Sequence, residues 1–107
     1  SLRREKLEKA KKMSYHSNVL EPDNGTYQDT YAWILYQQQN YLEAKEWINK
    51  AIENDGYKSA VVIEHFGDIL YKLGDIENAV NQWKKALILK PGSDVLQQKI
   101  KDQKLYE

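Results

Sequence analysis

The stretch that decides the fold runs from Phe66 to Pro91 and has the sequence FGDILYKLGDIENAVNQWKKALILKP. Apolar residues recur in it every three or four positions, which places them on one face of an α-helix. The pattern is interrupted at Gly74-Asp75, where glycine suits the end of one helix and aspartate suits the start of the next. The stretch therefore predicts two short helices joined by a tight turn.

Much of this stretch has a counterpart 35 residues earlier in the chain. Small and large residues recur in the same order, which is what repeated packing against neighbouring helices requires. The repetition predicts two helical hairpins, over residues 25–58 and 59–93. The equivalent segments are Ile34-Leu35-Tyr36 with Ile69-Leu70-Tyr71, Ala44 with Ala79, and Lys50-Ala51-Ile52 with Lys85-Ala86-Leu87.

Polar residues and glycine mark the expected ends of these helices. Thr26, followed three residues later by Asp29, is expected to begin the first helix, and Ser59 is expected to cap the third. Gly56 is expected to end the second helix in the left-handed conformation that glycine adopts readily. Trp47 and Trp83, each on the second helix of a hairpin, are predicted to lie in the core.

The second hairpin resembles the tetratricopeptide repeat (TPR). Gly67 and Ala79 stand where the two helices of a TPR cross closely, and Ala86 stands where the next repeat packs. The first hairpin matches more loosely, with Ala32 where glycine is commoner and Gly56 where proline is commoner. The resemblance implies an all-α fold, a TPR-like right-handed α-solenoid of helix-turn-helix repeats (an α-α superhelix).

The resemblance extends over about residues 7–107 and implies a single TPR-like domain, 1–107. Residues 2–20 are expected to form the second helix of a truncated repeat. Residues 94–107 are expected to form a capping helix with a polar, solvent-exposed outer face. The pattern is similar to the C-terminal part of longer bacterial TPR proteins. The natural C-terminus is accordingly expected near Glu107, with the partner of the first helix before Ser1.

The composition narrows the possible functions. The chain has 107 residues, 16 basic and 16 acidic, and no cysteine, which excludes disulfides, thiolate metal sites and thiol nucleophiles. Net charge is zero, so nucleic-acid binding is not expected, and no apolar run is long enough for membrane insertion. His16 and His65 stand apart and no glycine-rich loop is present, so neither catalysis nor a metal or cofactor is expected.

In TPR families the concave wall is made of the first helix of each hairpin and commonly holds an extended peptide or a partner's helix. The resemblance therefore implies a non-catalytic protein–protein interaction module or scaffold with a protein or peptide partner. Carried over residue by residue, the predicted partner-binding positions are Asp29, Trp33, Tyr36 and Gln37 in the first hairpin and Glu64, Asp68, Tyr71 and Lys72 in the second.

Residue character suggests how that wall would select a partner. Trp33, Tyr36 and Tyr71 are expected to be apolar anchors, although packing against a neighbouring repeat is the alternative for Trp33. The three acids of the wall favour a partner carrying Lys or Arg. Carboxylate-clamp TPRs use Lys and Asn at positions where this chain has acids and Trp33, so no such clamp is predicted.

Two alternatives to groove binding stay open. The first helix is expected to expose Leu7, Ala10 and Met13, which a second copy of the chain would cover in a homodimer. Alternatively, the array is a structural spacer of a larger, envelope-associated protein. The sequence does not decide between a cytoplasmic and an envelope or periplasmic location.

Overall fold

The computed structural model describes residues 1–105, and six α-helices and one short 3-10 helix account for most of them. This part of the chain contains no strand, so the prediction of an all-α fold is confirmed. The helices are α1 (Leu2–Leu20), α2 (Gly25–Gln37), α3 (Tyr41–Glu53), α4 (Ala60–Lys72), α5 (Ile76–Leu89) and α6 (Asp94–Asp102), and η1 (Gly56–Lys58) lies between α3 and α4.

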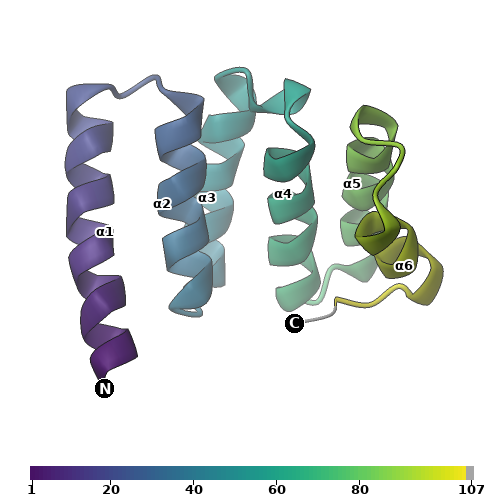
Figure 1. Cartoon of the computed structure of the whole chain (residues 1–107), viewed down its shortest axis with the longest axis horizontal. Coiled ribbons are helices and arrows are strands. Elements are labelled where there is room, and N and C mark those ends of the chain that lie inside the picture. The colour runs from purple at the N-terminus through teal and green to yellow at the C-terminus, as the bar shows by residue number, and fades with distance from the viewer. Residues whose placement is uncertain (106–107) are drawn as a thin grey trace.

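The helices stand side by side in chain order and form two antiparallel hairpins, α2–α3 and α4–α5 (Figure 1). α1 packs against α2 at one end of the stack, and α6 packs against α5 at the other. The molecule measures 37 × 32 × 22 Å. Two clusters of buried side chains run through it, one centred on the first hairpin and one on the second.

Small residues allow close helix crossings at the positions that the repeat pattern indicated. Ala44 and Ala79 are fully buried, and so is Ala32 on α2. A Cβ added to Gly67 would lie 2.5 Å from the Trp83 ring, so no larger residue fits there without movement. Close packing of this kind explains why small residues recur with the period of the repeat.

The helix ends agree with the sequence in part. Ser59 and Asp75 cap α4 and α5 as their patterns indicate, and Ser93 caps α6. Each accepts the backbone N–H of the residue three positions later. The prediction that Thr26 begins α2 is wrong. The helix begins at Gly25, and Asn24 caps it by accepting the Tyr27 N–H at 3.1 Å.

Gly56 does not have the role that the sequence suggested. The left-handed residue after α3 is Asp55, with φ 73°, whereas Gly56 begins η1. A Cβ on Gly56 would lie 2.3 Å from the Ala51 carbonyl oxygen. The glycine is therefore required by close backbone approach and not by its φ angle.

The two tryptophans of the second helices differ in burial. Trp83 is fully buried, as predicted. Trp47 is only half-buried, but it packs against the first core cluster, and its ring lies beside Tyr15 of α1 and Tyr31 of α2. It packs edge-on to Tyr31 with ring centroids 4.6 Å apart, and the Lys50 Nζ lies 4.0 Å from its centroid.

α6 is shorter than the capping helix expected over residues 94–107. It ends at Asp102, and Gln103 adopts a left-handed conformation with φ 48° that turns the chain back toward α4 (Figure 1). The rest of that expectation, at residues 106–107, lies outside the described part of the chain. Although the outer face of this helix was expected to be solvent-exposed, its Lys99 is only 4% exposed, because the ammonium contacts two carboxylates of α4.

Candidate functional site

A cavity of about 300 Å³ opens on the face formed by the first helices of the hairpins. Side chains from four segments meet there: α2, α4, α6 and the residues that follow α6. Four of them were predicted from the sequence and three were not. The lining consists of Trp33, Tyr36, Glu64 and Asp68, together with His65, Lys99 and Leu105.

One wall of the cavity is a stack of aromatic rings. Trp33 lies between Tyr36, with centroids 4.3 Å apart and planes 8° from parallel, and His65, 3.9 Å away at 18°. The His65 Nδ1 is 2.8 Å from the Asp29 Oδ1, which fixes the imidazole from its far side. Trp33 is thus held rigid by its neighbours and also borders the cavity. It is both a packed side chain and a cavity-lining one.

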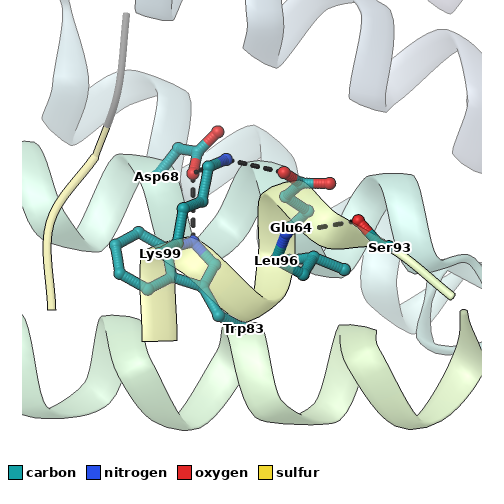
Figure 2. A network of polar contacts seen from close by, with 6 residues as sticks. All are labelled: Glu64, Asp68, Trp83, Ser93, Leu96 and Lys99. Atoms are coloured by element: carbon teal, nitrogen blue, oxygen red, sulfur yellow. Dashed lines mark hydrogen bonds and ion pairs between the residues drawn. The ribbon is translucent and has the colours of Figure 1, made fainter. Parts of the chain in front are cut away.

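The opposite end of the cavity is a buried network of charges (Figure 2). The Lys99 Nζ donates to Glu64 Oε2 at 2.6 Å and to Asp68 Oδ1 at 3.0 Å. The same Asp68 oxygen accepts the indole N–H of Trp83 at 3.0 Å. Burial raises the pKa of Asp68, and the Lys99 ammonium and the Trp83 N–H oppose that rise.

This pairing changes the electrostatics expected for the face. Glu64 and Asp68 are paired with Lys99, and Asp29 is paired with His65, so all three acids have partners inside the chain. Asp68 is 5% exposed and bonds to residues of two other helices, Trp83 of α5 and Lys99 of α6. Its geometry is that of a structural carboxylate.

The other predicted residues lie away from the cavity. Asp29 borders a separate, polar depression between the start of α2 and the loop around Gly56. Gln37 is exposed near the start of α1, and Tyr71 is half-buried with its ring 6.0 Å from Trp83. Lys72 is exposed at the end of α4. The structure therefore gathers only the middle of the predicted wall into one site.

The sequence pattern missed three lining residues for different reasons. His65 carried no signal of a nearby partner, because its pairing with Asp29 spans two hairpins. Lys99 follows Leu96 by three residues and precedes Ile100 by one, so helical spacing did place it beside the buried face of α6. Leu105 carried no signal, because its position depends on where α6 ends.

A second, larger opening of about 790 Å³ lies between α1 and α2 and is mostly apolar. Ala10 and Met13 line it from α1, and Tyr27 and Ile34 line it from α2. Met13 is 66% exposed. Ala10 precedes Ala44 by 34 residues, but Ala44 is covered by the first helix of its hairpin and Ala10 has no such cover.

Residues 1–105 contain no group of three or more His, Cys, Asp or Glu side chains placed to hold a metal ion. Within the same residues, no helix has the length and apolar character that crossing a membrane requires.

Comparison with known proteins identifies the repeat and the fold. Residues 27–57 match the family model for the tetratricopeptide repeat. The Arabidopsis OM64 TPR domain superimposes with a TM-score of 0.86 and 19% sequence identity, over 96% of this chain and 84% of that domain. No curated protein sequence is significantly similar to the chain.

Two further TPR domains of similar structure were solved with peptides. The first TPR domain of Spaghetti (RPAP3), bound to the HSP90 peptide SRMEEVD, has a TM-score of 0.86 and 15% identity over 95% of this chain and 82% of its own. The second TPR domain of human RPAP3, in complex with the HSP70 peptide SGPTIEEVD, has a TM-score of 0.83 and 21% identity over 98% and 87%. The chain described here thus contains a tetratricopeptide repeat and has the fold of TPR domains, as predicted.

Proposed function

We propose that this chain is a non-catalytic protein-interaction module that holds a segment of a partner protein against α2 and α4. The observation that carries the proposal is the position of Trp33. Its ring is fixed between Tyr36 and His65 and borders an open cavity. A rigid aromatic side chain loses little entropy when a partner packs on it, which is why tryptophan and tyrosine are enriched in binding hot spots.

The fold supports the same proposal. Two TPR domains of similar structure hold short peptides, SRMEEVD and SGPTIEEVD. Both peptides end in an acidic residue. In the chain described here the cavity's Lys99 already contacts two carboxylates, so it is not available for a third. We therefore propose a partner segment held mainly by apolar contact with the aromatic wall and not by a carboxylate clamp.

A library of random peptides displayed on phage tests the proposal. Peptides that the wild-type chain enriches are expected to bind Trp33→Ala about tenfold more weakly, since loss of a hot-spot ring costs at least 1.4 kcal/mol. Trp47→Ala is the matched control, because it removes a half-buried tryptophan on the side of α1. Circular dichroism checks that both variants stay folded. Equal binding to wild type and Trp33→Ala would remove Trp33 from the binding surface.

Self-association through α1 is a second candidate function. The opening between α1 and α2 leaves Met13 exposed beside an apolar lining, and a second copy would bury that surface. Sedimentation over a range of concentrations is expected to show a dimer for wild type and a monomer for Met13→Asp. A wild-type chain that stays monomeric at high concentration excludes this role.

A further inference from the structure

We propose that residues 103–105 act as an internal ligand of the cavity, so that a partner segment must present an aliphatic side chain in place of Leu105 and displace it. This inference rests on the function proposed above. It goes further by naming the chemistry of the partner and the competitor that the chain itself supplies.

Residues 103–105 reach the cavity because α6 ends early. α2 and α4 each have 13 residues, whereas α6 has nine. If α6 continued to the same length, residues 103–105 would be part of the helix. Instead Gln103 turns the backbone with φ 48°, and the Lys104 N–H bonds back to the Lys99 carbonyl at 3.2 Å.

Leu105 makes the contact that an apolar ligand side chain would make. It is half-buried and packs against both core clusters, where the two hairpins meet. It also lines the cavity together with Trp33 and Tyr36. An aliphatic group beside an aromatic wall is the apolar contact that the proposed function assigns to the partner.

Residues 103–105 are held more loosely than the helices. Gln103 and Lys104 are exposed, and their backbone hydrogen bonds close a single turn at 3.4 and 3.2 Å. Beyond that turn, Leu105 is the one apolar anchor among residues 103–105. A segment outside the helices with one half-buried apolar side chain opens more easily than a packed helix, so a ligand in solution can compete with it.

A fluorescently labelled peptide with the chain's own sequence KDQKLYE, residues 101–107, serves as the probe. Its affinity for the full-length wild-type chain and for full-length Leu105→Asp is measured by anisotropy. Leu105→Asp is expected to bind the probe about tenfold more tightly, because a site occupied internally in about nine chains out of ten is available in only one. Leu105→Ala, which perturbs the fold less, is expected to change affinity in the same direction.

Two controls assign the binding to the cavity. A probe with aspartate in place of its leucine is expected not to bind, and adding Trp33→Ala to Leu105→Asp is expected to abolish binding of the original probe. Thermal unfolding monitored by circular dichroism shows that each variant is folded.

Equal affinity of wild type and both Leu105 variants would overturn the inference, as would no binding of the probe to any of them. Neither result would touch the proposed function. That function fails separately, if no peptide from the random library depends on Trp33.

Discussion

The two hairpins differ in the side chains that fill the crossing between their helices. In the first, Ala32 of α2 and Ile48 of α3 lie in the same buried cluster and both are fully buried. In the second, the equivalent positions, 35 residues later, hold Gly67 and Trp83. Trp83 is also fully buried, and its ring fills the space that a side chain on Gly67 would need. Volume is thus redistributed between the two helices of a hairpin while the crossing itself is kept.

Because the second hairpin has Trp83 where the first has Ile48, it needs additional polar partners in its core. An indole N–H buried in a core needs an acceptor, and Asp68 supplies it. A buried carboxylate in turn needs a cation, which comes from Lys99 on α6 (Figure 2). Ile48 makes no such demand, and the position equivalent to Asp68 is Trp33. Trp83 therefore accounts for the polar network in the second hairpin, whereas the first hairpin, with no buried N–H to satisfy at Ile48, has an aromatic residue at the position of Asp68.

The largest effect is expected from removing the cation of that network. Lys99→Met leaves Asp68 and Glu64 with no positive partner in the cavity, and breaking a buried ion pair on one side costs about 3 kcal/mol of unfolding free energy. Urea denaturation measures it. Lys45→Met, a substitution on α3 of the first hairpin, is the control and is expected to change stability by less than about 0.5 kcal/mol. A small loss for Lys99→Met would mean that water solvates the network.

The stability loss of Lys99→Met is expected to depend on pH, and the direction follows from the pKa of Asp68. Burial raises the pKa of Asp68, and the Lys99 ammonium lowers it, so Lys99→Met raises that pKa further. A carboxyl whose pKa is higher in the folded state binds its proton more tightly there, and its contribution to stability grows as pH falls. The stability deficit of Lys99→Met relative to wild type should therefore shrink between pH 7 and pH 4. A deficit that is constant with pH would contradict this.

A smaller effect is expected at the crossing itself. Gly67→Ala is expected to cost about 2 kcal/mol, because its Cβ overpacks the Trp83 ring. In a Trp83→Ile background, which copies the first hairpin, the same substitution should be neutral or stabilising, since alanine favours helix over glycine by about 1 kcal/mol. A double-mutant cycle of urea unfolding curves measures the coupling. Additive effects would show that the two positions do not compensate each other.

Much of the fold was predictable because its determinants are local. The recurring small residues, through the resemblance to the TPR, implied close crossings at Ala44 and Ala79, and Ser59 and Asp75 predicted two helix starts. Each of these features depends on residues a few positions apart on one helix or on the turn beside it.

The cavity was less predictable because its contacts span separate hairpins. The pairs Asp29–His65 and Glu64–Lys99 join residues 36 and 35 positions apart, and their geometry depends on how the stack curves. The burial of Lys99 depends on Trp83, which the sequence identified as core without indicating that its N–H needs an acceptor. Leu105 depends on the length of α6, which ends at Asp102 although no glycine or proline stops it there.

The smallest expected effect concerns the turn inside each hairpin. Gly74 has φ 87° between α4 and α5, and Gln39 occupies the equivalent place between α2 and α3 with φ 66°. A left-handed conformation costs a residue with a side chain about 1–2 kcal/mol, whereas glycine adopts it freely but has more freedom to lose on folding. Gln39→Gly is therefore expected to stabilise the chain by about 0.5–1 kcal/mol, which corresponds to a rise in Tm of about 3 °C.

The reverse exchange separates backbone strain from packing. A Cβ on Gly74 would meet no atom within 4 Å, so Gly74→Gln has no steric neighbour to displace and any loss of stability comes from the backbone. It is expected to cost about 1 kcal/mol, close to the gain from Gln39→Gly but opposite in sign. Thermal unfolding of both single variants measures the two effects. If Gln39→Gly lowers Tm, the Gln39 side chain contributes more than its backbone conformation costs, and the two turns are not equivalent.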